Sequence, residues 1–266
     1  CQKHVKPSQL NDAETFYPLH AFVCTSCWLV QLGEFATPEE IFAQEYAYFS
    51  SFSDTWLKHA RDYCDTMRER LRLNRESLVV EIASNDGYLL RNFVAAGIPV
   101  LGVEPAANCA EAAGKIGVRS VVEFFGTETA RSLSSRYGQA DLLLGNNVLA
   151  HVPDLNDFVR GMALMLKPTG VITMEFPHLM HLVEQNQFDT IYHEPFSYFS
   201  FTTVEKVFAA HGITLYDVEE LPTHGGSLRI FGRHRAHVLP VTERVVDLKR
   251  REEAWGVARP DVYRSF

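Results

Sequence analysis

Polar and acidic residues follow three apolar stretches that are typical of buried parallel strands, residues 78–83, 99–104 and 141–146. In doubly wound sheets, ligands bind outside the carboxyl ends of the strands, and an acid after the second strand bonds ribose hydroxyls. The first turn lacks the G-x-G-x-x-G spacing that lets a backbone approach a pyrophosphate, so we predict a nucleoside without phosphates, S-adenosylmethionine. The predicted cofactor residues are Glu81, Ser84, Asn85, Asp86, Gly87, Glu104, Pro105, Asn146 and Asn147.

A second group of residues suited to chemistry lies between positions 175 and 200, directly after another apolar stretch. Its histidines, glutamate and tyrosines suit proton transfer, because histidine titrates near neutral pH. The alternative interpretation is an aromatic lid without catalytic groups, since aromatic residues also pack loops well. The residues that we single out here are Tyr192, His193 and Glu194.

One pair of the five cysteines, Cys24 and Cys27, has the spacing of a metal knuckle. An odd cysteine count without an export signal disfavours a disulfide framework. Tetrahedral zinc needs two further ligands, and Cys1 and His4 form a second pair with suitable spacing. We therefore predict structural Zn²⁺ at these four residues, and the alternative is a redox pair or two plain cysteines.

The last two predicted strands, residues 213–219 and 227–232, are joined by too few residues for a parallel crossover and should form an antiparallel hairpin. Parallel strands followed by such a hairpin predict an α/β fold with the doubly wound, Rossmann-like sheet of class I methyltransferases. A long amphipathic helix over 54–73 precedes this sheet. The predicted domains are a cysteine-containing module at 1–36, a helical connector at 37–77, the cofactor-binding domain at 78–233 and a helical linker at 234–266.

The composition agrees with a soluble enzyme. The 266 residues are 46% hydrophobic, enough for one sizeable core, and the formal net charge of −8 disfavours nucleic acid as a partner. No apolar run approaches the ~20 residues of a membrane span, and no signal peptide is recognisable, so we expect a cytoplasmic protein with a small-molecule substrate and no membrane partner.

Five motifs together resemble the S-adenosylmethionine-dependent sugar C-methyltransferase family. The resemblance implies methylation at C3 of dTDP-4-keto-6-deoxy sugars in deoxysugar biosynthesis, with an N-terminal zinc module. It further implies that Tyr46 or Tyr48, His151, Tyr192 and Glu194 line the sugar. The motifs are Tyr46-Ala-Tyr48-Phe-Ser-Ser-Phe-Ser, Glu81-Ile-Ala-Ser-Asn-Asp-Gly87, Asn147-Val-Leu-Ala-His151-Val-Pro-Asp-Leu-Asn156, Tyr192-His-Glu194 and His224-Gly-Gly-Ser-Leu-Arg229.

The chain departs from this family at one position that matters for catalysis. The family segment reads Tyr-His-Glu-His, and its second histidine is the expected base, whereas this chain has Pro195 there. We nominate His151 as the substitute base, because it follows a strand end of the predicted cleft, with His193 or a tyrosine of lowered pKa as further candidates. Family members also continue beyond residue 266, so we expect the chain to lack a C-terminal domain.

Three other functions remain open on the sequence. The acceptor atom can be an oxygen or nitrogen of another small molecule, which requires no base for a carbon acid. The chain can be a cofactor-binding relative with impaired catalysis, or a zinc-dependent scaffold protein. Turnover of a keto sugar separates the first prediction from all three.

Overall fold

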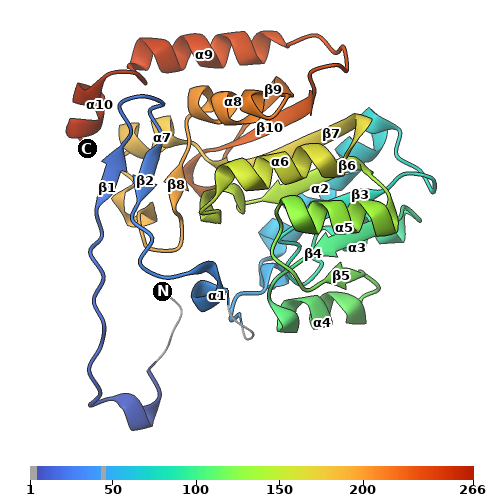
Figure 1. Cartoon of the computed structure of the whole chain (residues 1–266), viewed down its shortest axis with the longest axis horizontal. Helices are drawn as coiled ribbons and strands as arrows, with labels where there is room; N and C mark the ends of the chain where they lie inside the picture. The colour runs from blue at the N-terminus through green and yellow to red at the C-terminus, as the bar shows by residue number, and fades with distance from the viewer. Residues whose placement is uncertain (1–4, 43–45) are drawn as a thin grey trace.

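The computed structural model describes residues 5–42 and 46–266, and within them seven strands form one mixed sheet (Figure 1). The strands are β3 (Val79–Ile82), β4 (Val100–Val103), β5 (Ser120–Val121), β6 (Ala140–Asn146), β7 (Leu166–Pro177), β9 (Ile213–Leu221) and β10 (Ser227–His234). Their order across the sheet is β5-β4-β3-β6-β7-β10-β9. The order reverses beside β3, which pairs with both β4 and β6. That is the switch point at which doubly wound sheets bind ligands.

The strands β3 to β7 are parallel, and β10 inserts antiparallel between β7 and β9. The predicted antiparallel hairpin is therefore present, and its connection contains a short 3₁₀ turn, Thr223–Gly225. Five parallel strands followed by this hairpin confirm the class I methyltransferase fold predicted from the sequence.

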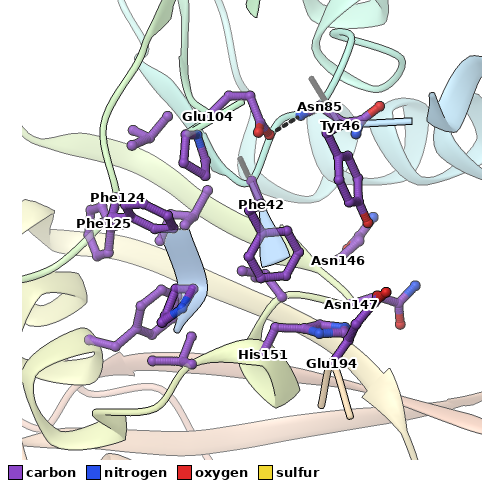
Figure 2. Close-up of a pocket in the computed structure, with 18 of the residues that line it drawn as sticks. Phe42, Tyr46, Asn85, Glu104, Phe124, Phe125, Asn146, Asn147, His151 and Glu194 are labelled. Carbon is purple, nitrogen blue, oxygen red and sulfur yellow. Dashed lines mark hydrogen bonds between the residues drawn. The ribbon is translucent and has the colours of Figure 1, made fainter. Parts of the chain in front are cut away.

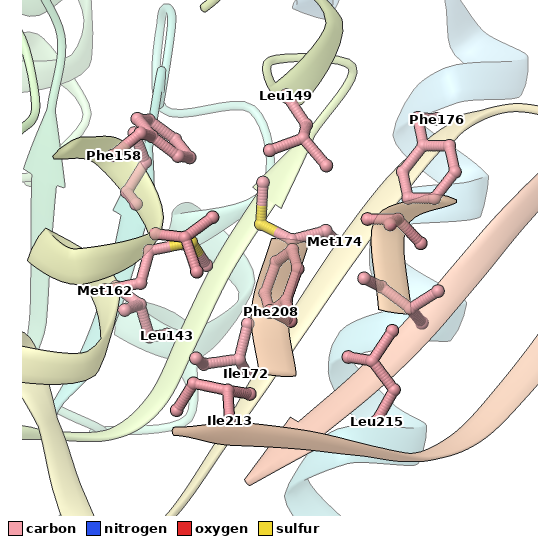
Figure 3. Close-up of a cluster of buried hydrophobic side chains, with 14 of the residues drawn as sticks. Leu143, Leu149, Phe158, Met162, Ile172, Met174, Phe176, Phe208, Ile213 and Leu215 are labelled. Carbon is pink, nitrogen blue, oxygen red and sulfur yellow. The ribbon is translucent and has the colours of Figure 1, made fainter. Parts of the chain in front are cut away.

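Apolar side chains on the two faces of the sheet are covered by two sets of helices. One face packs on α2 through Tyr63 and Met67. The other face packs on α6 through Phe158 and Met162, and Figure 3 shows this second cluster. The first set is α2 (Asp54–Leu71), α3 (Leu90–Ala95) and α4 (Ala107–Lys115), and the second is α5 (Thr127–Tyr137), α6 (Leu155–Met165), α8 (Phe201–Ala210) and α9 (Glu243–Trp255).

The boundaries of α2 follow from its end residues. The Ser53 hydroxyl accepts the N–H of Trp56 at 3.3 Å and so caps the first turn. Arg72, in the left-handed conformation with φ 53°, ends the helix two residues before the predicted end. The capped first turn fixes Trp56, and the next turn carries His59; both matter for the site described below.

The N-terminal residues form a separate three-stranded sheet at one edge of the molecule (Figure 1). It consists of β1 (Ala21–Val23), β2 (Val30–Leu32) and β8 (Ser197–Tyr198). The pairing of Val30 with Tyr198 attaches the cysteine hairpin to the segment that carries Tyr192 and Glu194. Three short helices, α1 (Pro38–Ile41), α7 (Leu179–Glu184) and α10 (Pro260–Arg264), complete the fold.

A buried carboxylate attaches α9 to the sheet domain. Glu252 is fully buried and accepts the backbone N–H groups of Phe201 at 2.6 Å and Thr202 at 2.8 Å, at the start of α8. It also accepts the Nε2–H of the buried His178 at 2.8 Å. No helix in the described part of the chain is long and apolar enough to cross a membrane.

Candidate active site

A pocket of about 550 Å³ lies over the carboxyl ends of β3, β4 and β6, at the switch point of the sheet. Figure 2 shows Glu104 and Asn85 at one end of this pocket and His151 and Glu194 at the other. A pocket of this size accommodates a nucleoside together with part of a second ligand. Its lining includes Phe42, Tyr46, Tyr48, Trp56, Asn85, Tyr88, Glu104, Pro105, Phe124, Phe125, Asn146, Asn147, His151, Tyr192, Glu194 and His224.

The carboxylate of Glu104 is fixed by the backbone around it. Its two oxygens accept the N–H groups of Asn85 and Ala106, each at 2.8 Å. Burial raises the pKa of Glu104, and the two backbone bonds act in the opposite direction. A carboxylate has about four lone-pair sites, so two stay available to hydroxyl donors in the pocket.

The turn after β3 is held in an unusual backbone conformation. Ala83 and Asn85 have φ values of 56° and 49°, in the left-handed region that non-glycine residues rarely adopt. The Asn85 side chain accepts the N–H of Ser50 at 2.8 Å and donates to the carbonyl of Tyr48 at 3.1 Å. Strain of this kind persists where surrounding bonds enforce it, and it concentrates at ligand sites.

The predicted cofactor residues divide into two groups. Asn85, Glu104, Pro105, Asn146 and Asn147 line the pocket. The other four lie behind the pocket surface: Glu81, Ser84, Asp86 and Gly87. Within the described residues, several buried oxygens near this end have no hydrogen-bond partner, namely both of Glu81, Oγ of Ser84, Oδ1 of Asp86 and Oδ1 of Asn147. Of these residues, Asn147 also lines the pocket, and its unpaired Oδ1 suits a ligand that carries hydroxyl or amino groups, as S-adenosylmethionine does.

The segment with Tyr46 and Tyr48 forms a wall of the pocket because neighbouring side chains hold its backbone. The Asn108 amide accepts the N–H of Tyr46 at 3.1 Å and donates to its carbonyl at 2.9 Å. The Asp86 carboxylate accepts the N–H of Ser51 at 3.2 Å. Asp86 therefore acts through the wall segment, although it does not line the pocket.

Two tyrosines of the pocket, Tyr46 and Tyr192, keep their protons. Burial raises the pKa of Tyr192 to about 12, and the nearby Glu194 acts in the same direction. Burial, followed by the charge of Glu194, also raises the pKa of Tyr46 well above its ordinary value. The lowered tyrosine pKa that we considered for a substitute base is therefore not found at these positions, and both hydroxyls are hydrogen-bond donors at neutral pH.

Of the two histidines that we considered as substitute bases, only His151 lies in the pocket. Its ring contacts Phe42 edge-on at 5.8 Å, and burial lowers its pKa while the neighbouring Glu194 acts to raise it. His193 does not line the pocket: its Nε2–H donates to the carbonyl of Pro18 at 3.2 Å, on the side of the N-terminal segment.

Residues 56–218 match a family described as a methyltransferase domain. This chain belongs to the methyltransferase family. Residues 1–42 match a domain to which zinc binding is provisionally assigned. Residues 222–266 match the C-methyltransferase C-terminal domain, and this match covers the residues that we interpreted as a linker.

The methyltransferase is 37% identical over 253 residues to the C-methyltransferase NovU of Streptomyces niveus, a match that covers 95% of this chain and 60% of NovU. The chain thus spans less than two thirds of this relative. Two solved structures share its fold. The PH0226 protein of Pyrococcus horikoshii has 17% identity and a TM-score of 0.57, over 70% of this chain and 94% of that one. An S-adenosylmethionine-dependent methyltransferase of Anabaena variabilis has 16% identity and a TM-score of 0.52, and the match covers 66% of this chain and 85% of that one.

The pocket residues that we did not predict as site residues include Trp56, Tyr88 and His224. Trp56 stacks on His59 at 4.8 Å and contacts the ring of His224 edge-on at 5.4 Å. In the sequence, Trp56 has the spacing of a buried residue in an amphipathic helix, and His224 lies in the short connection between two strands. The hydrophobic periodicity therefore does not indicate a functional site at either residue. Only the His-Gly-Gly motif of the family resemblance included His224.

The two cysteines of the N-terminal module lie in the turn between β1 and β2. The carbonyl of Cys24 accepts the N–H of Trp28 at 2.8 Å, and its N–H donates to Leu29 at 2.9 Å. Backbone N–H groups of the turn, with the thiol of Cys27, lower the pKa of Cys24, which favours the thiolate that binds metals. Cys1 and His4 lie outside the described residues, so the structure supplies two donors of the four that zinc requires.

Proposed function

We propose that this protein is an S-adenosylmethionine-dependent C-methyltransferase that acts on a nucleotide-linked keto-deoxysugar through an enolate. The observation that supports the proposal most is the arrangement of one pocket, which joins a nucleoside-binding end at Glu104 to a group of acid–base residues around Glu194. The 37% identity to the C-methyltransferase NovU agrees with it.

The nucleoside end of the pocket would hold the cofactor. The two lone pairs that Glu104 keeps available would accept the ribose hydroxyls. Phe124 and Phe125 form the adjacent wall, where an adenine ring can pack, and Asn146 and Asn147 lie at the end of β6. When bound, S-adenosylmethionine supplies a methyl group on a sulfonium, an electrophile that a carbanion can attack.

The opposite end of the pocket would bind the sugar and stabilise the enolate. A C3 proton beside a C4 ketone is weakly acidic, so donors must hydrogen-bond the oxygen on which charge develops. Tyr46 and Tyr192, whose raised pKa values keep them protonated, and the imidazole of His151 are the donors that we assign to it. Glu194 would hold a sugar hydroxyl, and Tyr48 lines the pocket as well.

Proton removal needs a base, and Pro195 has no titratable side chain. Tyr46 and Tyr192 are poor bases because their pKa values are raised, and His193 lies outside the pocket. We assign this role to an imidazole of the pocket, because histidine titrates near neutral pH.

The N-terminal module would bind structural zinc through Cys24 and Cys27, completed by Cys1 and His4.

A panel of nucleotide-linked sugars tests the proposal. The purified protein is incubated with S-adenosylmethionine and 4-keto-6-deoxysugars or their 4-hydroxyl counterparts, and S-adenosylhomocysteine release is measured. We expect release only with keto sugars and a new carbon-bound methyl group at C3 by NMR. A methyl group on oxygen or nitrogen would establish the alternative acceptor class, and cofactor binding without turnover of any sugar would show a catalytically impaired relative.

A further inference from the structure

Within the described residues, two histidines line the pocket, His151 and His224, and they enter it from different elements. His151 ends a short 3₁₀ turn, Leu149–His151, after β6, whereas His224 lies in the turn between β9 and β10. Each is the kind of group that can accept a proton near neutral pH, so the pocket offers two candidates for the position that Pro195 leaves without a base.

The turn that carries His224 has an unusual backbone conformation that hydrogen bonds hold in place. His224, Gly225 and Gly226 have φ values of 51°, 76° and 115°, all in the left-handed region. The turn is bonded on both sides: the N–H of Gly226 donates to the Thr223 carbonyl at 2.9 Å, and the Gln187 amide donates to the Gly225 carbonyl at 2.8 Å. A non-glycine residue in this conformation is held by its surroundings, a pattern that is common at functional sites.

The imidazole of His224, in contrast, forms no hydrogen bond to any other residue that the structure describes, and the residue is exposed to solvent while it lines the pocket. The Trp56 ring contacts the imidazole edge-on, at 5.4 Å and 83°. The backbone of the turn is thus held by hydrogen bonds, one side of the imidazole contacts Trp56, and both ring nitrogens stay available to a ligand. Such preorganisation is what a proton acceptor needs.

The buried carboxylate of Glu175 is one of the groups that act on the pKa of His224. Glu175 accepts the Nε2–H of His59 at 3.0 Å, an Arg229 N–H at 3.0 Å and the Thr223 hydroxyl at 3.2 Å. Burial acts to raise the pKa of Glu175, but His59 and Arg229 hold it below its ordinary value, so it is ionised. Desolvation lowers the pKa of His224 and keeps it neutral before the proton arrives, whereas the charge of Glu175 acts to raise this pKa and His59 acts to lower it.

We propose that His224 is the general base of this enzyme and replaces the histidine that the family carries at the position of Pro195. This assignment rests on the proposed function. The C3–H bond breaks, its electron pair forms the C3=C4 double bond of the enolate, and the proton passes to a ring nitrogen of His224. C3 then attacks the methyl group, the sulfur keeps the electron pair of the broken S–CH3 bond, and the imidazolium returns its proton to solvent.

Solvent access distinguishes His224 from His151. The base must release its proton after each turnover, and His224 is exposed, whereas His151 is only partly exposed and is covered by the ring of Phe42. His151 is therefore the hydrogen-bond donor to the C4 oxygen, and His224 is the residue that exchanges its proton with water.

Hydrogen exchange tests this assignment without methyl transfer. The probe is dTDP-4-keto-6-deoxyglucose with deuterium at C3, and its loss to solvent is followed by NMR in the absence of S-adenosylmethionine. His224→Asn, which tolerates the left-handed conformation, should reduce the exchange rate about 10²- to 10⁴-fold, the usual contribution of a positioned base. Calorimetry should show unchanged S-adenosylmethionine affinity. His211→Asn, a surface histidine bonded to Asn156, is the control.

Chemical rescue separates a base from a structural role. In His224→Gly, free imidazole should restore exchange, because glycine accepts the positive φ and leaves space for the added ring. His151→Gly should not be rescued. Exchange that persists in His224→Asn, or rescue that occurs only in His151→Gly, would overturn the assignment. If the wild-type protein neither exchanges nor methylates any keto sugar of the panel, the proposed function fails instead.

Discussion

Each oxygen of Glu104 accepts one backbone N–H group, and these bonds aim the remaining lone pairs at the pocket. The sequence made this residue predictable, because an acid at the end of the second parallel strand has a fixed place in a doubly wound sheet. The same rule placed Asn146 and Asn147 at the pocket edge. The rule does not distinguish residues that line the pocket from Glu81, which lies on strand β3 but is fully buried and does not line the pocket.

Replacement of Glu104 by alanine should weaken S-adenosylmethionine binding by ~1.5–3 kcal/mol, the usual value for hydrogen bonds to a charged group. Isothermal calorimetry measures this directly. Glu128→Ala, which removes an exposed carboxylate paired with Arg131 on α5, should leave affinity unchanged. Equal affinities of the wild type and a folded Glu104→Ala variant would contradict the cofactor assignment.

Restoration of the family histidine provides a second test at the residue scale. Because His224 supplies the base in our proposal, Pro195→His should change the turnover number by less than about tenfold. A gain of about 10²- to 10⁴-fold, measured as S-adenosylhomocysteine release, would show instead that the natural chain lacks a base. Pro195→Ala is the matched control, since it removes the ring without adding an imidazole.

At the scale of elements, the long strands and the hairpin could be predicted because their apolar runs and short connection leave few alternatives. The two-residue strand β8 could not, since so short a strand has no periodicity and its partner β2 lies far away in sequence. Likewise, Trp56 and His59 follow the spacing of an amphipathic helix, and only the packing of α2 shows that its first two turns face the pocket and Glu175.

The buried Glu252 is expected to contribute strongly to stability. Glu252→Ala should lower the free energy of unfolding by about 3–5 kcal/mol at pH 7, because it leaves His178 and two N–H groups at the start of α8 without an acceptor. Urea denaturation measures the loss, with the exposed neighbour Glu253→Ala as control. Equal stability of the two variants would exclude this role.

The same contact predicts a pH dependence. Burial acts to raise the pKa of Glu252, but hydrogen bonds from His178 and Thr202 bring it below its ordinary value. A lowered folded-state pKa means that the stabilisation is fully present above the unfolded value of about 4.3 and is lost as the pH falls through the folded pKa. The difference in the free energy of unfolding between the wild type and Glu252→Ala should therefore shrink below about pH 4. A difference that stays constant down to pH 3 would contradict this role of Glu252.

At the scale of the whole molecule, the N-terminal hairpin supports the substrate end of the pocket. Strand β2 pairs with β8, three residues after Glu194, and Val30 and Leu32 pack on Leu179 and Leu182. The conformation of the segment that carries Tyr192 therefore depends on the module that contains Cys24 and Cys27.

Removal of zinc should consequently affect catalysis more than cofactor binding. We expect about one zinc per chain by elemental analysis, and Cys24→Ser should bring the zinc content close to zero. A chelator should lower both the melting temperature and the turnover number while S-adenosylmethionine affinity is retained. Ser26→Ala, between the two cysteines, is the control. An active preparation that contains no metal, and whose melting temperature is unchanged by a chelator, would rule out the zinc site.

The attachment of this hairpin also constrains the order of assembly. The Thr203 hydroxyl donates to the Cys27 carbonyl at 3.4 Å, across 176 positions of sequence. During synthesis at about 5–20 residues per second, the hairpin therefore leaves the ribosome roughly ten seconds or more before the residues it docks on exist. During that interval only local bonds can hold its shape, and a metal ion bound by the two cysteines would keep the hairpin folded until its partner residues, up to Thr203, have been made.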